Sequence, residues 1–233
     1  MSVRRALRPL MRPAIRALPP VRGLWRLLGR RAELDFWRRR PDLICDHQRE
    51  WVYTRCFGVD RGWYREKRIL DVGCGPRGSL DWATDAAARV GLDPLADEYL
   101  ALGVDAGAME YVRGVAERMP FPTDSFEVVA SINALDHVDD VRRAAAEMVR
   151  VLRPGGLLLL ATELNHRARL TEPQTFGWEV VELFAPPLEL VEERRYEDSG
   201  AGIDRSLADA VPYRDPQGHR LGVLVAKLRA PTP

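Results

Sequence analysis

The sequence predicts an α/β fold: a doubly wound, mostly parallel seven-stranded sheet with helices on both faces and an antiparallel C-terminal hairpin. Two observations predict it. After a turn-rich break at 58–62, short apolar runs alternate with stretches of helical spacing, and this alternation calls for parallel strands joined by right-handed crossovers. In the last third, two apolar runs are joined by a loop without helical periodicity, which favours an antiparallel pair closing the edge of the sheet.

Each expected element follows from its local pattern. Apolar runs bounded by glycine, proline or polar residues predict parallel strands at 69–72, 89–92, 111–113, 126–131 and 157–162. Apolar residues at helical spacing predict helices at 80–88, 96–102 and 139–151. The late elements are a helical stretch at 176–183 and strands at 188–196 and 220–228, with 200–218 as a loose connection.

Composition divides the chain into three parts. Residues 1–32 form a basic extension rich in arginine and proline, and its first 31 residues contain nine arginines and no acid. Prolines interrupt any continuous apolar helical face there. A solvated, partly disordered leader is therefore favoured over a segment that makes weak contact with an anionic membrane surface. Residues 33–62 mix aromatic and charged residues at helical spacing, which predicts a helical cap on the main domain at 63–233.

The composition also narrows the classes of function. With 46% hydrophobic and 30% charged residues among 233, the chain is globular, and no apolar run approaches the roughly 20 residues that span a bilayer. Its three cysteines fit neither a disulfide framework nor a zinc site, which predicts a cytoplasmic location. Outside the first 31 residues, 34 acidic residues outnumber 26 basic ones, so a nucleic-acid partner is not expected.

A glycine-rich turn follows the first predicted strand, where residues 69–78 read ILDVGCGPRG. Its glycines allow the backbone to approach a ligand closely, and they fit the dinucleotide pattern GxGxxG, with Asp93 twenty residues after Gly73. Two neighbours oppose a pyrophosphate. The Asp71 carboxylate would repel it, and Pro76 removes a backbone N–H donor. The turn therefore suits a sulfonium cofactor with an ammonium group better than a phosphate.

On these residues the chain resembles the class I, Rossmann-like S-adenosylmethionine-dependent methyltransferases, of the small methyltransferase-domain type. Their first motif reads DxGCGxG, whereas DVGCGPRG has one extra residue before the last glycine. Four further blocks follow in the family's order, namely GLDP at 91–94, AERMPF at 116–121, DSFEVV at 124–129 and VLRPGG at 151–156. The resemblance covers residues 64–228 and implies that 63–233 is a class I methyltransferase domain.

The resemblance implies S-adenosyl-L-methionine as the cofactor. The residues that it assigns to cofactor binding are Asp71, Gly73, Cys74, Gly75, Asp93, Pro94, Ala116, Glu117 and Asn133. Asp93 would bind both ribose hydroxyls, as acids at the end of the second strand do in nucleotide-binding folds. The glycine turn would lie against the methionine portion, with Asp71 near its amino group. Asn133 would contact the cofactor or the transferring methyl group.

The adenine-lining segment departs from the family's pattern. Before the pair Ala116 and Glu117, this chain has Val115 where the family often has an acid, so a contact with the adenine amino group is not implied. Plain structural alternatives also stay open. Asp93 could cap a helix, Glu117 could be a solvated charge and Asn133 could be a turn residue.

Two histidines are candidate catalytic bases. Methyl transfer from a sulfonium is an in-line displacement that depends mainly on positioning and desolvation, but an imidazole can remove the proton of a hydroxyl acceptor. His137 follows the fourth predicted strand and His166 the fifth, at the edge of the sheet where ligands of such folds bind. Asp136 precedes His137 as an orienting acid would. No metal site is predicted, because Asp136, His137, Asp139 and Asp140 lack a defined ligand spacing.

The acceptor site is expected beneath the segment 162–177 and the helices at 33–57. Arg167 and Arg169 suit a phosphate or carboxylate, and tryptophans such as Trp37 suit a sugar or a planar ring. These features favour a small-molecule or glycan-like acceptor methylated on a hydroxyl oxygen. The alternatives are a catalytically inactive binding module with the methyltransferase fold, which the retained glycine turn opposes, and a nicotinamide-dependent oxidoreductase, which the turn's carboxylate opposes. Nothing in the pattern indicates an oligomeric state.

Overall fold

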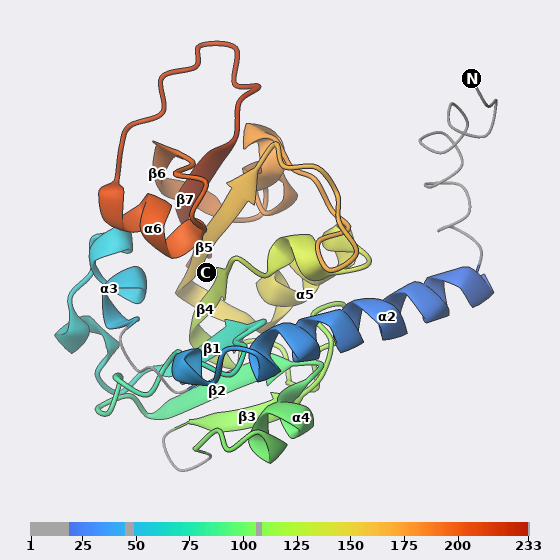
Figure 1. Ribbon diagram of the computed structural model, residues 1–233. Coiled ribbons are helices and arrows are strands. Elements are labelled where there is room, and N and C mark those ends of the chain that lie inside the picture. Colours follow the sequence, from blue (N-terminus) through green and yellow to red (C-terminus); the bar gives the residue numbers. More distant parts are fainter. Residues whose placement is uncertain (1–18, 45–48, 106–108, 233) are drawn as a thin grey trace.

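The computed structural model describes residues 19–44, 49–105 and 109–232 (Figure 1). A seven-stranded sheet has the order β3-β2-β1-β4-β5-β7-β6. The parallel strands are β1 (Arg68–Val72), β2 (Ala88–Asp93), β3 (Glu110–Arg113), β4 (Phe126–Ile132) and β5 (Leu152–Leu164). β7 (Gly222–Arg229) pairs antiparallel with β5 and with β6 (Glu189–Glu197). The predicted fold class is confirmed, including the antiparallel C-terminal hairpin.

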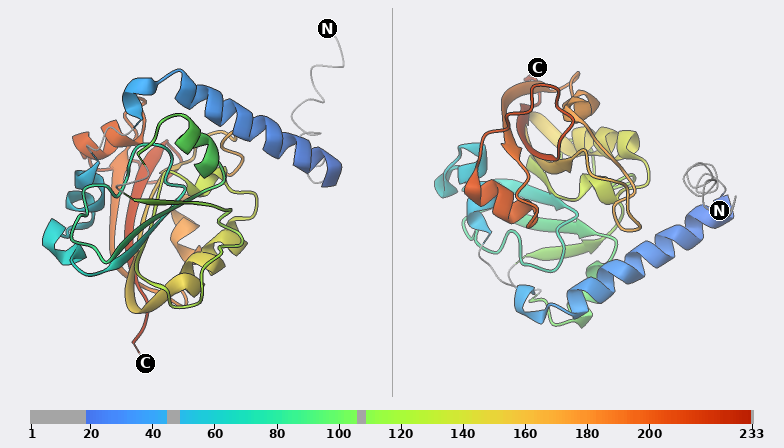
Figure 2. Two further views of the ribbon diagram at one scale, coloured as in Figure 1. Left: turned by 90° about the horizontal axis from the view of Figure 1, so that it is seen from below. Right: turned by 45° about the horizontal axis from the view of Figure 1, so that its top comes forward.

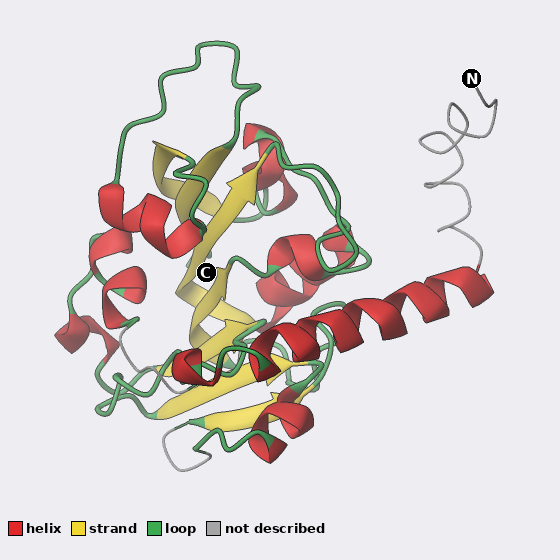
Figure 3. Cartoon of the chain, in the orientation of Figure 1, coloured by secondary structure: helices red, strands yellow, loops and turns green. Residues whose placement is uncertain are grey.

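Helices cover both faces of the sheet (Figure 3). The α-helices are α2 (Pro19–Arg38), α3 (Glu50–Tyr53), α4 (Ala96–Ala101), α5 (Val141–Val151) and α6 (Ile203–Asp209). Short 3-10 helices are η2 (Pro41–Leu43), η3 (Arg55–Phe57), η4 (Arg61–Tyr64), η5 (Leu135–His137) and η6 (Trp178–Leu183). Successive side chains of a strand point to opposite faces, so Leu70 packs in the layer beneath α5 and Ile69 in the layer beneath α3 and α6.

The strand order reverses between β1 and β4, which places a switch point where ligands bind in folds of this kind. At this point Asp71 lies opposite Gly91 on β2 and Ala130 on β4. The three strands therefore end together, and the loops that follow them share one edge of the sheet. That edge carries most of the residues predicted to bind the cofactor.

Two local predictions are wrong. The segment 80–88 forms successive turns instead of a helix, and its buried residues Leu80, Trp82 and Ala83 do not form the one-sided stripe that a packed helix needs. The connection 200–218 contains α6, whose seven residues are too few for a helical period to stand out in the sequence. β5 also begins at Leu152, five residues earlier than predicted, with Gly155 at φ +75° within it.

The N-terminal helix α2 is continuous across residue 32, where composition places the boundary of the extension. It begins with two prolines, which the first turn of a helix tolerates because its N–H groups have no helical partner. Figure 2 shows α2 along one edge of the domain, with its N-terminal end projecting past the body. Residues 1–18, on which the predicted disorder and membrane contact mainly rest, lie outside the described residues. Within those ranges, no helix is long and apolar enough to span a membrane.

Candidate functional site

A cavity of about 1080 Å³ opens at the carboxyl edge of the sheet. Its wall comes from the glycine turn after β1, from the ends of β2 and β4, and from α2 and the segments 168–174 and 201–204. Small-molecule sites measure roughly 300–1,000 Å³. The cavity is therefore large enough for a nucleoside cofactor together with an acceptor.

The glycine turn is held against the loop that follows β4. Gly73 has φ +76°, a left-handed conformation that glycine adopts without strain, and its N–H donates to the Leu92 carbonyl at 2.7 Å. A Cβ at Gly73 would collide with the side chain of Ala134, whereas a Cβ at Gly75 would lie 3.7 Å from the Trp37 ring of α2. The turn thus brings its backbone close to two neighbouring elements and leaves that backbone on the cavity wall.

Asp93 is fixed at the end of β2 with both carboxylate oxygens engaged. Oδ1 accepts the N–H of Leu95 at 2.8 Å, and Oδ2 accepts the N–H of Gly75 at 3.2 Å. Asp93 lines the cavity and is 7% exposed, and burial raises its pKa to about 6. Since each carboxylate oxygen can accept more than one hydrogen bond, Asp93 can organise the turn and still accept hydrogen bonds from a ligand.

Asp71 lies behind the glycine turn and is not among the residues that line the cavity. It is 1% exposed, and its Oδ2 accepts hydrogen bonds from the Tyr53 hydroxyl at 2.8 Å and the Ser79 hydroxyl at 2.5 Å. Burial raises the pKa of this carboxyl, against the effect of both hydroxyl donors. Asp71 therefore joins β1 to α3 and to the end of the turn, and its predicted role near the cofactor's amino group stays a prediction.

Tyr53→Phe is expected to lower the free energy of unfolding by about 1–2 kcal/mol, because it removes one of two side-chain donors from the buried Asp71 carboxylate. Urea unfolding at pH 7 measures the change. Tyr213→Phe is the control, since that hydroxyl bonds to the Arg220 carbonyl near the surface, and the loss there should stay below about 0.5 kcal/mol. Equal losses in the two variants would contradict the proposed importance of the Asp71 contact.

The adenine-lining residues predicted from the sequence reach the cavity wall. Ala116 and Glu117 both line it, together with Val115 and Gly114. The Glu117 carboxylate accepts the backbone N–H groups of Asp139 at 2.8 Å and Asp140 at 3.2 Å. Glu117 therefore has a structural partner at the start of α5, and it is not a freely solvated charge.

The wall at the end of β4 carries polar atoms without partners among the described residues. The Ser131 hydroxyl and the Asn133 Oδ1 atom are buried without a hydrogen bond, and both residues line the cavity. Asn133 has φ +53°, as a turn residue would. Buried polar atoms normally have a hydrogen-bond partner, so this wall fits a polar ligand such as S-adenosylmethionine. Cys74 and Pro94 also line the cavity, and burial raises the pKa of the Cys74 thiol.

The two candidate bases meet at Asp136. The Nε2 atom of His166 lies 3.4 Å from Asp136 Oδ2, and Nε2 of His137 lies 3.8 Å from Asp136 Oδ1. His137 lines the cavity, whereas His166 is buried behind the wall. The neighbouring Asp136 raises the pKa of His166. The sequence pairs Asp136 with His137 only, because a contact with a residue thirty positions later leaves no local pattern.

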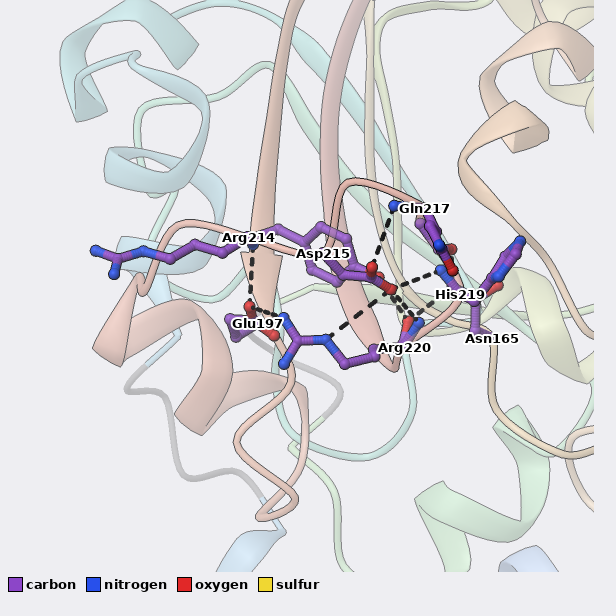
Figure 4. Close-up of polar contacts among 9 residues, drawn as sticks. Asn165, Glu197, Arg214, Asp215, Gln217, His219 and Arg220 are labelled. Atoms are coloured by element: carbon purple, nitrogen blue, oxygen red, sulfur yellow. Dashed lines mark hydrogen bonds and ion pairs between the residues drawn. The ribbon is translucent and has the colours of Figure 1, made fainter.

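The segment after β5 is anchored at Asn165. Its side-chain amide donates to the carbonyls of Gly218 and Arg220, each at 2.8 Å (Figure 4). Gly218 and Arg220 belong to the loop that precedes β7. Asp215 holds this loop in place by accepting hydrogen bonds from the N–H groups of Gln217, His219 and Arg220. These bonds fix the chain direction just before His166.

Beyond this anchor the segment forms part of the cavity wall, and its predicted role over the acceptor stays a prediction. Residues 168 and 170–174 line the cavity, and the Gln174 amide ties them to the Val138 carbonyl at 2.9 Å. The two arginines predicted to meet an acceptor are exposed and are not among the lining residues. Arg169 forms an ion pair with Glu172 at 3.2 Å.

Comparisons with known proteins identify a methyltransferase domain in this chain. Residues 70–160 match the family described as the methyltransferase domain. The phthiotriol/phenolphthiotriol dimycocerosates methyltransferase of Mycobacterium leprae is 42% identical over 100 residues, which cover 41% of this chain and 37% of that protein. The phthiotriol/phenolphthiotriol dimycocerosates methyltransferase 1 of Mycobacterium ulcerans is 35% identical over 133 residues. These residues cover 55% of this chain and 46% of that protein. The chain thus spans less than half the length of these curated relatives.

Solved structures share the fold. An S-adenosylmethionine-dependent methyltransferase from Mesorhizobium loti has a TM-score of 0.55 at 23% identity, covering 79% of this chain and 99% of that one. The [4+2]-cyclase SpnF has a TM-score of 0.52 at 21% identity, and the match covers 72% of this chain and 76% of that one. Residues 70–160 therefore match a methyltransferase domain, and the five motifs, the sheet topology and these relatives support a class I S-adenosylmethionine-dependent methyltransferase.

Proposed function

We propose that the protein transfers the methyl group of S-adenosylmethionine to a hydroxyl oxygen of a small-molecule or glycan-like acceptor. One observation carries this proposal. A single cavity has a fixed carboxylate, Asp93, beside the glycine turn and a histidine, His137, beneath the segment 168–174. The cavity is large enough for a cofactor and an acceptor side by side, and His137 would receive the hydroxyl proton of an acceptor bound there.

The cofactor would lie along the wall formed by the ends of β1, β2 and β4. Asp93 would accept hydrogen bonds from the ribose hydroxyls, and Ala116 would pack against the adenine. The unpartnered oxygens of Ser131 and Asn133 are suited to polar groups of the methionine portion. Trp37 of α2 covers the glycine turn, which would exclude water from the sulfonium.

When bound, S-adenosylmethionine supplies a methyl group on a positively charged sulfur and leaves as the neutral thioether S-adenosylhomocysteine. The protein's contribution is to align an acceptor hydroxyl with this methyl group and to receive the hydroxyl proton. His137 would take that proton on a ring nitrogen. Asp136, 3.8 Å from His137 Nε2 and almost fully buried, would stabilise the resulting imidazolium.

The acceptor class rests on two kinds of support. The cavity wall at 168–174 combines Leu170 and Pro173 with polar residues such as Thr171 and Gln174, a mixture that suits a hydroxylated compound. The mycobacterial relatives carry a name that contains a triol, in keeping with a hydroxyl acceptor. The second candidate is a binding function without methyl transfer. A solved structure with the same fold is named a [4+2]-cyclase, so the fold alone does not establish methyl transfer.

Adenosylhomocysteine is expected to raise the melting temperature of the purified protein, and NADH is expected to leave it unchanged. At a ligand concentration one hundred times its Kd, mass action stabilises the folded state by about 2.7 kcal/mol. Thermal-shift titrations measure both ligands. Stabilisation by NADH alone would contradict the cofactor assignment.

The transfer step is tested with methyl-labelled S-adenosylmethionine and a panel of hydroxylated acceptors. Label is expected in an ether product, and His137→Gln is expected to slow the reaction at pH 7 by about 10²–10⁴-fold while adenosylhomocysteine binding persists. Binding of adenosylhomocysteine without turnover of any acceptor in the panel would favour the binding module instead.

A further inference from the structure

Three side chains from separate segments gather behind the acceptor end of the cavity. Asp136 belongs to η5, His166 follows β5, and Glu172 lies on the segment that lines the cavity. One potential ligand atom of each lies within 4.8 Å of the others. Asp136 is 1% exposed and His166 is 8% exposed, so two of the three donors are shielded from solvent.

Three polar atoms of this cluster lack hydrogen bonds within the described structure. Both carboxylate oxygens of Asp136 and the Nε2 atom of His166 are buried without a hydrogen-bond partner. The 3.4 Å separation of His166 Nε2 from Asp136 Oδ2 is an ion-pair distance, but its geometry satisfies neither atom as a hydrogen bond. A buried carboxylate is costly unless it is paired and hydrogen-bonded or binds a metal, so Asp136 calls for a further partner.

The charges around the cluster favour a cation as that partner. Burial and the nearby carboxylates of Asp198, Asp136 and Glu172 raise the pKa of Glu163, in keeping with an excess of acidic groups around the cluster. His137 lies on the opposite side of Asp136 at 3.8 Å. Among the described residues, Glu172 pairs with Arg169, whose side chain is 68% exposed. Carboxylates therefore outnumber the buried positive charge available to them.

We propose that Asp136, His166 and Glu172 hold one divalent first-row transition metal ion, with Mn²⁺ or Zn²⁺ as the best match. Imidazole combined with carboxylates suits these ions better than Ca²⁺, which prefers oxygen ligands alone. Three protein ligands leave coordination positions open. Of the three proposed ligands only Glu172 lines the cavity, so the ion would lie behind the cavity wall.

Metal binding is tested on the full-length protein after treatment with a chelator. Titration with MnCl₂, followed by the electron paramagnetic resonance signal of free Mn²⁺, is expected to show one bound ion per chain. Asp136→Asn and Glu172→Gln should each weaken binding at least tenfold. Asp139→Asn is the matched control, because Asp139 lines the same cavity but lies outside the cluster, and it should bind as the wild type does. Zn²⁺ should displace the bound Mn²⁺.

Glu172→Gln keeps the test decisive if Asp136→Asn fails to fold, because Glu172 lies on a loop and is only partly buried. Circular dichroism of each variant establishes its folding. Absence of stoichiometric Mn²⁺ binding by the wild type, or equal affinity in wild type and Glu172→Gln, would overturn the metal site. Adenosylhomocysteine binding to the same chelator-treated protein is measured in parallel, so failure of the metal site and failure of the proposed function are distinguished.

Discussion

Asp93→Ala is expected to weaken adenosylhomocysteine binding at least tenfold. The carboxylate lines the cavity, and the N–H groups of Gly75 and Leu95 hold it in place. If both ribose hydroxyls donate to it, two charge-assisted bonds at about 1.5 kcal/mol each correspond to roughly a hundredfold in affinity. Isothermal titration calorimetry measures the change directly.

Asp97→Ala is the matched control for this variant. Asp97 is an exposed acid four residues further along the chain, and its carboxylate pairs with Arg113 at 2.9 Å outside the cavity. Its removal should leave adenosylhomocysteine affinity within twofold of the wild type. Equal affinities of Asp93→Ala and the wild type would remove the ribose assignment.

The same residue predicts how binding depends on pH. Burial raises the Asp93 pKa from 3.8 to about 6, so the carboxyl becomes protonated as the pH falls below about 6 and loses part of its capacity to accept hydrogen bonds. Affinity should therefore decline below pH 6 in the wild type and stay level in Asp93→Asn. For the unliganded protein, the raised pKa of Asp93 fixes the direction in which folding stability changes with pH. Asp93 contributes stability below pH 4 that is lost as the pH rises to 6, by about 3 kcal/mol.

The sequence predicts best those residues that stand next to a recognisable strand or turn in the chain. The strand before the glycine turn, Asp93 at the end of the next strand and Asn133 after the fourth all mark ends of parallel strands. Ends of adjacent parallel strands meet at one edge, so these residues share a cavity whatever the details of packing. The residues that line this edge of the cavity are therefore largely predictable from the sequence.

The acceptor side is less readable, because its contacts are not local. Asp136, His166 and Glu172 are separated by thirty and six positions and come together only through the pairing of β4 with β5 and the return of the loop. Tyr53 and Ser79 meet at Asp71 in the same way. The position of α2 over the glycine turn is a further example. Composition places a boundary at residue 32, within α2, yet residues on both sides of that boundary line the cavity.

Gly73→Ala is expected to lower the free energy of unfolding by about 3 kcal/mol and to reduce cofactor binding. Two effects add. A side chain at φ +76° is strained by about 1 kcal/mol or more, and the new Cβ would collide with Ala134 in the loop after β4, with an overpacking cost of about 1–3 kcal/mol. Relief of the collision requires the two loops to separate, and both line the cavity.

Gly103→Ala separates these two effects, since Gly103 has φ +96° but a Cβ there would meet no atom within 4 Å. It measures strain alone and should cost about 1 kcal/mol, with adenosylhomocysteine affinity unchanged. Urea unfolding and calorimetry on both variants give the comparison. If Gly73→Ala costs no more than Gly103→Ala, the turn after β1 is free to move away from Ala134. Close contact between the β1 and β4 loops would then not be what shapes the cofactor wall.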